Sequence, residues 1–279
     1  MDEVIDWLLQ GDPSVRWQTE RDLTGGPWET TRRDVPNGWA GAILAHRRSD
    51  GTWPTGWYSP KWTSTFYSTQ VLAQLGVPVA ESVHAMLDRG LSDGRFRLWE
   101  SRNDDVCVTA MMLTMARGEE VAMPGAVERL LEQQLPDGGW NCRRGATHAS
   151  VHSTLSVLEA LGAHPTAAAG REFLLRHRLF RSHRTGAVMR AEFTRFSFPT
   201  YWYYDVLRAL DYWRGFSWDD RLEEAVEVVR SKAVAGRWRL QNPHRGETWV
   251  EMEKVGQPSR MVTLRALRVL QWADQPRNT

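Results

Sequence analysis

The chain has 279 residues, of which 42% are apolar and 25% charged, a composition that supports a large buried core. Its 35 Lys and Arg nearly balance its 34 Asp and Glu, so the net charge favours neither nucleic acid nor an anionic membrane as a partner. No apolar run approaches the roughly 20 residues of a membrane span, and the N-terminus lacks the basic and apolar regions of a signal peptide. We therefore predict a cytoplasmic protein with no membrane span. The two cysteines, Cys107 and Cys142, are then expected to be free or bound to metal.

The N-terminal segment predicts two short helices, at residues 3–10 and 12–23. Asp12 is suited to the N-cap of the second helix and Pro13 to its first position.

Three similar turn segments follow and indicate a repeat. They read RRSDGTW, LSDGRF and LPDGGW, and they place Asp50, Asp93 and Asp137 at intervals of 43 and 44 residues. A fixed period of this length is typical of stacked structural units.

Each turn segment is followed by a helical apolar run, at residues 63–76, 104–116 and 150–162. Apolar residues recur there at i, i+3, i+4 and i+7, which is the period of a helix. A more amphipathic helix precedes each turn, as at 125–134. The repeating unit is therefore helix, Asp-Gly turn, loop and helix.

Two further units follow the same order in less regular form. Residues 171–189 lead to 198–213, and 220–238 lead to 258–273, with Pro199 and Pro258 expected at helix starts. Together with the N-terminal pair these make six helical hairpins. We predict a single all-α domain over 1–279, an (α/α)6 barrel whose N-terminal helix pairs with the last inner helix to close the ring. An open solenoid is the alternative, but it would need polar capping helices at its ends.

The segment from Gln134 to Trp140 fits the Q-x-x-D-G-x-W repeat of squalene and oxidosqualene cyclases. The whole chain resembles the (α/α)6 toroid that these cyclases share with protein prenyltransferase β subunits. The turn chemistry is mechanical, because Asp-Gly begins a tight turn and the Trp packs across helix ends. The resemblance therefore implies an architecture, and function has to be sought in the loops and at the starts of the inner helices.

The inner helices can be aligned on Leu72, Leu113 and Leu158, which places Phe66, Cys107 and His152 in one register. Cys107 and His152 are then expected to be neighbours around the ring, with Asp105 at the same mouth. A thiolate, an imidazole and a carboxylate form a ligand set for tetrahedral zinc with one open position, which is the catalytic pattern.

The resemblance implies the same site. Prenyltransferase β subunits hold zinc on an Asp-x-Cys and a His at successive inner helices, matched here by Asp105, Cys107 and His152. There the metal activates a thiol for alkylation by a prenyl diphosphate, and a separate helical subunit takes part. This chain departs from that pattern at Trp99, where a basic residue is expected, and at Val108, where a tyrosine is expected. It also lacks the D-x-D-D acid of the cyclases.

Other residues are predicted to line the same mouth. The expected aromatic wall consists of Trp57, Trp62, Trp99, Tyr201 and Trp249. The arginines expected to hold an anionic group are Arg102, Arg143, Arg144, Arg190 and Arg195. The candidate proton-transfer residues are His148, Tyr204, Glu192 and Glu251. The long loop at 239–257 is suited to a lid.

Three functions remain open. The first is a zinc-dependent transferase of prenyltransferase type, acting on a hydrophobic or anionic small molecule or a peptide. The second is a zinc-dependent lyase, cyclase or hydrolase in the same cavity, and the third is a non-enzymatic toroid that binds a lipid or a protein partner, with a helical partner subunit still possible. Nucleotide-binding, Rossmann, serine-hydrolase and zincin motifs do not occur in the sequence.

Overall fold

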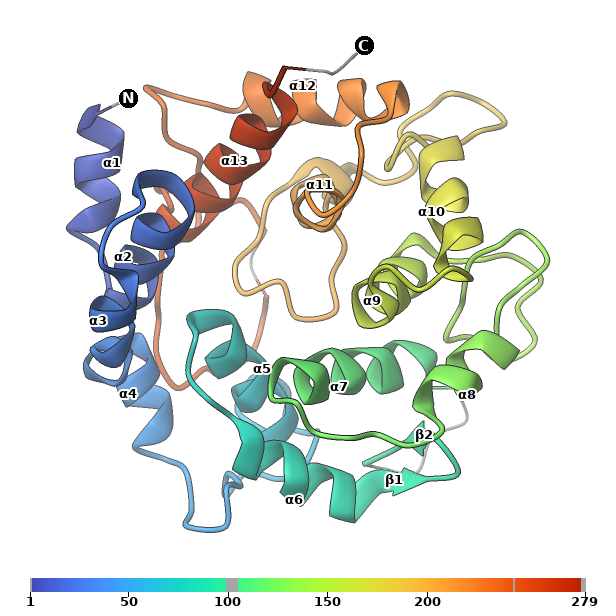
Figure 1. Ribbon diagram of the computed structural model, residues 1–279, viewed down its shortest axis with the longest axis horizontal. Coiled ribbons are helices and arrows are strands. Elements are labelled where there is room, and N and C mark those ends of the chain that lie inside the picture. Colours follow the sequence, from blue (N-terminus) through green and yellow to red (C-terminus); the bar gives the residue numbers. More distant parts are fainter. Residues whose placement is uncertain (1, 99–104, 243, 277–279) are drawn as a thin grey trace.

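The chain folds as a closed ring of helices in two layers (Figure 1). The structure is a computed structural model that describes residues 2–98, 105–242 and 244–276. The inner layer consists of α2 (Pro13–Thr19), α5 (Thr65–Leu75), α7 (Val106–Gly118), α9 (Val151–Leu161), α11 (Val206–Trp213) and α13 (Arg260–Ala273). The prediction of an all-α toroid is confirmed.

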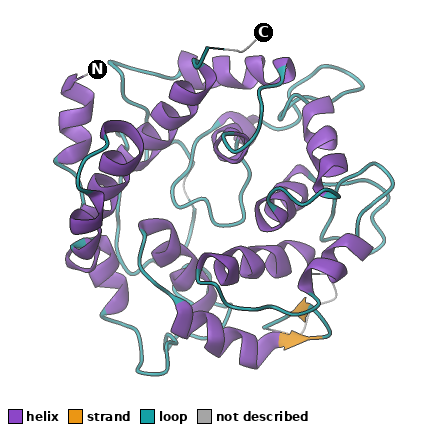
Figure 2. Ribbon diagram, viewed as in Figure 1, coloured by secondary structure: helices purple, strands orange, loops and turns teal. Residues whose placement is uncertain are grey.

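The outer layer and the connections complete the ring. The outer helices are α1 (Asp2–Leu9), α3 (Trp28–Arg33), α4 (Trp39–Leu44), α6 (Ala80–Gly90), α8 (Ala126–Glu132), α10 (Ala167–Arg176) and α12 (Glu223–Ser231). Shorter turns are η1 (Glu20–Thr24), η2 (Val35–Asn37), η3 (Ala191–Thr194) and η4 (Asp220–Leu222). Figure 2 shows one small hairpin among the helices, made by the antiparallel strands β1 (Leu91–Ser92) and β2 (Arg95–Phe96).

The Asp-Gly segments form the predicted turns. Asp93 and Gly94 both have positive φ, at 49° and 71°, as a two-residue hairpin turn requires, and they connect β1 to β2. In the third repeat, Asp137 accepts hydrogen bonds from the backbone N–H groups of Gly139 and Ala149. The Asp137 carboxylate thus supports its own turn.

The aromatic residue after each turn anchors the turn to both helices of its hairpin. Its backbone N–H donates to a threonine of the next inner helix, at 3.0–3.2 Å. The pairs are Trp53 with Thr65, Phe96 with Thr109, Trp140 with Thr154, and Trp238 with Thr263. The three indoles also donate to carbonyls of the preceding outer layer, those of Ile43, Leu130 and Val229. The repeat therefore persists in the last hairpin, where the Asp-Gly turn is absent.

Polar side chains join every inner helix to the next around the ring. In ring order from α2 the links are Gln18 to the Gln74 carbonyl, Gln70 to Met111, Arg117 to the Ala160 carbonyl, Arg208 to Glu159, Arg265 to Asp211, and Arg268 to Gln18. Because the last link returns to α2, the ring is closed by side chains as well as by the backbone path.

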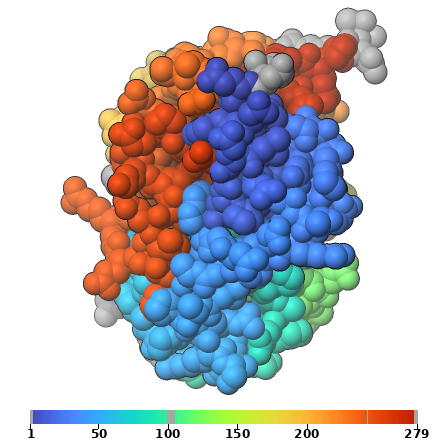
Figure 3. Space-filling model, turned by 90° about the vertical axis from the view of Figure 1, so that its left-hand side faces the viewer, coloured from blue at the N-terminus to red at the C-terminus, as the bar shows by residue number. Residues whose placement is uncertain are grey.

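The two ends of the sequence pack against each other. Arg260 of α13 donates to the carbonyl of Trp7 in α1 at 3.0 Å, and its guanidinium lies over the Trp7 ring. Figure 3 shows the N-terminal segment side by side with the C-terminal one. No helix in the described ranges is long and apolar enough to cross a membrane.

The fifth hairpin differs from its prediction. The stretch 198–205 is a loop, and α11 begins only at Val206, with the Asp205 side chain accepting from the Arg208 N–H. The prediction of a helix start at Pro199 is therefore wrong. The segment instead runs through the middle of the ring (Figure 1), where Gln70 donates to the Tyr201 carbonyl and Trp62 stacks on the Tyr201 ring. These tertiary contacts override the local helical pattern.

Pro258 likewise lies outside a helix. Helix α13 begins at Arg260, and Ser259 caps it by accepting from the Val262 N–H at 2.9 Å. The predicted helical segment at 171–189 is helical only in its first part. Helix α10 begins earlier, at Ala167, and ends at Arg176. The chain then forms a loop in which Arg181 and Val188 make an isolated β-bridge.

Candidate functional site

The starts of three inner helices carry the register predicted from the sequence. Phe66, Cys107 and His152 are each the second residue of their helix, in α5, α7 and α9. Helices α7 and α9 pack directly against each other. The alignment of the repeats is therefore confirmed.

The nearest thiol to Cys107 is Cys142, from the loop between α8 and α9. The backbone N–H of Cys107 donates to the Cys142 sulfur at 3.0 Å, and the Ser153 hydroxyl donates to the same sulfur at 3.3 Å. Hydrogen bonds donated by the Cys107 thiol and by Ser153 lower the pKa of Cys142. The pKa of Cys107 is raised, because its thiol is the donor to Cys142 and is buried. The two cysteines are free thiols of unequal acidity.

Asp105 lies directly before α7, close enough to the thiol pair for its charge to oppose ionisation of both thiols. Its carboxylate is buried and forms an ion pair with the Arg97 guanidinium at 2.8 Å. Its backbone is left-handed, with φ of 53°, a conformation that Asp tolerates better than most residues. Asp105 therefore fixes the chain between β2 and α7.

His152 is held by the loop that precedes α11. Its Nδ1 accepts the backbone N–H of Tyr204 at 3.1 Å, and its ring packs on Phe193. Burial, and to a smaller extent the charge of Arg208, lowers the pKa of His152 to about 4. The imidazole is therefore neutral at neutral pH.

These residues do not form a zinc ligand set in this arrangement. Asp105 is committed to Arg97 and the Nδ1 of His152 to a backbone N–H. Within residues 2–98, 105–242 and 244–276, no group of three His, Cys, Asp or Glu side chains is placed to hold a metal ion. We assign no chemical step to zinc, and the zinc prediction stays a prediction.

The predicted aromatic wall is packed on itself. Trp62 stacks on Tyr201 with ring centroids 4.0 Å apart, and Trp249 stacks on His46 at 4.1 Å while donating to the Ser68 hydroxyl. Trp57 is half-buried. The hydroxyl of Tyr204, proposed for proton transfer, is buried and donates to the Leu179 carbonyl.

The other predicted residues are exposed. They are Arg143, Arg144, Arg190, Arg195, His148, Glu192 and Glu251. Arg190 lies 3.7 Å from Glu192 across an exposed ion pair. Trp99 and Arg102 lie outside the described residues.

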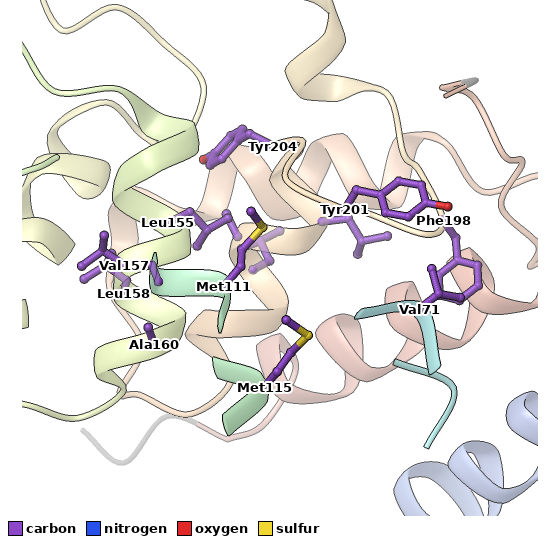
Figure 4. Close-up of a cluster of buried hydrophobic side chains, with 14 of the residues drawn as sticks. Val71, Met111, Met115, Leu155, Val157, Leu158, Ala160, Phe198, Tyr201 and Tyr204 are labelled. Carbon is purple, nitrogen blue, oxygen red and sulfur yellow. The ribbon is translucent and has the colours of Figure 1, made fainter. Parts of the chain in front are cut away.

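A cavity of about 520 Å³ lies within the ring, and of the predicted residues only Tyr201 is among its described lining. The walls come mainly from the second halves of the inner helices and from the 198–201 loop. The apolar part of the lining includes Ala73, Val77, Met111, Met115, Phe198 and Met261. Figure 4 shows Met111 and Met115 of α7 in one buried cluster with Phe198 and Tyr201 of the loop before α11.

Two ion pairs, each between a buried arginine and a half-buried carboxylate, form the polar wall of the cavity. Arg208 donates to Glu159 at 2.9 Å between α11 and α9, and Arg265 contacts Asp211 at 3.4 Å between α13 and α11. Burial opposes ionisation of Asp211, but the charges of Arg265 and Arg268 outweigh it and lower the pKa of Asp211. The wall is therefore charged at neutral pH.

The sequence carries a signal for this second wall that the repeat register does not capture. Arg208 and Asp211, and again Arg265 and Arg268, lie three residues apart within apolar inner helices. Residues at this spacing share a helix face, so charges at these positions point to a buried polar surface inside the ring.

The fold and this cavity define an all-α toroid with a small-molecule-sized hollow at its centre. No known protein family and no curated protein matches the chain. Among solved structures, a protein from Actinoplanes is 16% identical over 94% of this chain and 90% of that chain, with a TM-score of 0.48. A type II terpene cyclase from Scytonema, solved with its substrate geranylgeranyl dihydroxybenzoate, is 13% identical over 94% of this chain and 86% of that chain, with a TM-score of 0.49. At these values neither structure bears on the function.

Proposed function

We propose that the chain is an enzyme that acts on an isoprenoid, a small and largely apolar molecule, bound in the central cavity. The cavity carries this proposal, because about 520 Å³ falls within the roughly 300–1,000 Å³ of small-molecule sites. The resemblance of Asp105, Cys107 and His152 to the site of protein prenyltransferase β subunits, which use a prenyl diphosphate, supports an isoprenoid as the class of molecule.

The charged wall supports chemistry at this site. Titratable groups with shifted pKa values in a cavity are typical of binding and catalytic sites. Asp211 is such a group, and so is Arg268, whose pKa is lowered to about 10 by burial. The ion pair between the buried Arg208 and the half-buried Glu159 holds a fixed dipole beside the apolar lining.

Binding is tested with farnesol, a neutral isoprenoid alcohol, by isothermal titration calorimetry. Ala73→Trp places a large ring in the cavity and is expected to weaken binding at least about tenfold. The matched control is Ala168→Trp on the exposed face of α10, which should bind like the wild type. Equal affinities for the two variants would contradict the proposed site.

Turnover is tested separately with farnesyl diphosphate. Release of inorganic diphosphate, or a new isoprenoid product, supports a transferase, lyase or cyclase. Binding without any product instead supports the non-enzymatic toroid.

The zinc prediction has its own test, independent of the cavity. Elemental analysis of the wild type is compared with Cys107→Ala and His152→Ala. About one zinc per chain, lost in both variants, would support zinc binding by Cys107 and His152. No zinc after loading and removal of the excess would contradict it.

A further inference from the structure

The two cysteines of the chain meet in space although they belong to different elements. Cys107 is the second residue of α7, and Cys142 lies 35 residues later, in the loop between α8 and α9. The backbone N–H of Cys107 donates to the Cys142 sulfur at 3.0 Å, and the Cys107 thiol donates to the same sulfur. The sequence has no third cysteine, so each thiol has a single partner available within the chain.

The hydroxyl of Ser153, on α9, holds Cys142 in this position. It accepts the backbone N–H of Cys142 at 3.1 Å and donates to the Cys142 sulfur at 3.3 Å. The loop is therefore fixed against the starts of α7 and α9, and the two thiols do not have to find each other by diffusion. Such preorganisation favours a reaction between them.

The contacts of Cys142 make its sulfur the better nucleophile of the two. The sulfur accepts hydrogen bonds from the Cys107 thiol, from Ser153 and from a backbone N–H in the first turn of α7, and donors at a helix N-terminus stabilise a thiolate. The charge of Asp105 opposes ionisation of both thiols, but its carboxylate is paired with Arg97 at 2.8 Å.

The described residues leave both thiols partly exposed. The loop that carries Cys142 continues through the exposed residues 143–145, so it can give way while the rigid start of α7 stays in place. A small reagent can therefore reach the pair, and Cys142 can move the short distance that a covalent bond to Cys107 requires.

We infer that Cys107 and Cys142 form a reversible disulfide, with a hydroperoxide as the oxidant and a dithiol as the reductant. This modification site lies at the helix starts, and it depends neither on the central cavity nor on the proposed function. The disulfide would tie the loop before α9 to the start of α7. It would also exclude Cys107 from binding a metal, because a metal ligand has to be a thiolate.

The reaction has two steps. The Cys142 sulfur attacks one oxygen of hydrogen peroxide, so that an S–O bond forms and the O–O bond breaks. The second oxygen leaves as hydroxide and becomes water with the proton lost by Cys142. The Cys107 sulfur then attacks the sulfenic acid, the S–S bond forms, and the hydroxyl leaves as water with the Cys107 proton. The two thiols are oxidised by two electrons, and the peroxide is reduced to two waters.

The test treats the native full-length protein, freed of metal with EDTA, with a small excess of hydrogen peroxide. Iodoacetamide labelling followed by intact mass spectrometry counts the free thiols, and non-reducing peptide mass spectrometry identifies any crosslink. We expect a monomer without free thiols, in which the peptides of Cys107 and Cys142 are joined, and dithiothreitol should restore both thiols. Two thiols that remain free, a disulfide between two chains, or a sulfinic acid without a crosslink would each overturn the inference. None of these results requires a variant to fold.

Two matched variants test the order of the steps. In Cys107→Ser the second thiol is missing, so a sulfenic acid should accumulate at Cys142 and be trapped by dimedone. In Cys142→Ser the remaining thiol lacks the same donors, and its reaction with peroxide should be at least about tenfold slower. Equal rates for the two variants would overturn the assignment of Cys142 as the sulfur that reacts first.

Discussion

The two ends of the inner helices differ in what their polar side chains contact. At the helix starts, Asp105, His152 and Tyr204 are held by partners within the chain. In the cavity, Arg208 with Glu159 and Arg265 with Asp211 place charged groups on the wall. The repeat register therefore identifies positions that coincide around the ring, whereas the charged wall of the cavity lies outside that register.

The largest expected effect comes from breaking the charged wall of the cavity. Arg208→Met leaves Glu159 without its buried partner and also removes the hydrogen bond to the Tyr203 carbonyl. We expect a loss of about 3–5 kcal/mol in the free energy of unfolding, measured by urea denaturation. Arg129→Met, which breaks the exposed pair with Glu132, should cost less than about 1 kcal/mol. If Arg208→Met lost as little stability as Arg129→Met, the charged wall would not hold the ring together.

The sequence predicted the architecture well because periodicity and turn chemistry are local. The helices α5, α7 and α9 begin within two residues of the predicted runs, and the predicted Asp12 cap accepts from the Ser14 N–H. The segment 198–205 was mispredicted because contacts with Trp62 and Gln70, distant in sequence, determine its path.

The candidate site was predicted only in part. The register of Cys107 and His152 follows from the repeat, but the route of the loop that brings Cys142 onto Cys107 does not. The cavity wall depends on which helix faces meet, so Arg208 and Glu159, 49 residues apart, are joined only by the closed ring.

The next effect tests the boundary between the two regions. Tyr201 lines the cavity, and its ring also stacks on Trp62. The side chain is buried. Tyr201→Ala should lower the free energy of unfolding by about 3 kcal/mol, because a buried aromatic ring is removed. Tyr203→Ala, at a half-buried neighbour, should cost less than half as much. Similar losses in the two variants would show that Tyr201 has no special place in the packing.

A smaller effect concerns pH at the packed end. Burial lowers the pKa of His244 to about 4 from an ordinary value of 6.5, and its Nε2 donates to the Pro199 carbonyl. The unfolded chain therefore takes up a proton first, and stability should fall as pH decreases from 6.5 towards 4, with His244 contributing about 2 kcal/mol of this loss at pH 5.

Urea denaturation at pH 7, 6 and 5 measures this dependence. His244→Gln keeps a donor but cannot titrate, so its stability should change less with pH than that of the wild type. Parallel curves for the two proteins would contradict the assignment to His244.

The last prediction concerns the order in which the two thiols react, and it involves no change in stability. Because hydrogen bonds lower the pKa of Cys142 and raise that of Cys107, iodoacetamide should alkylate Cys142 first in the native protein. Peptide mass spectrometry during a time course reads the order of labelling. Faster labelling of Cys107 would reverse the proposed roles of the two thiols.

The most direct measurement is a crystal structure of the protein with farnesoate. The account predicts the isoprenoid chain in the central cavity, between Met111, Met115 and Phe198. Farnesoate bound instead at the helix starts, beside Cys107 and His152, with the central cavity empty, would contradict it.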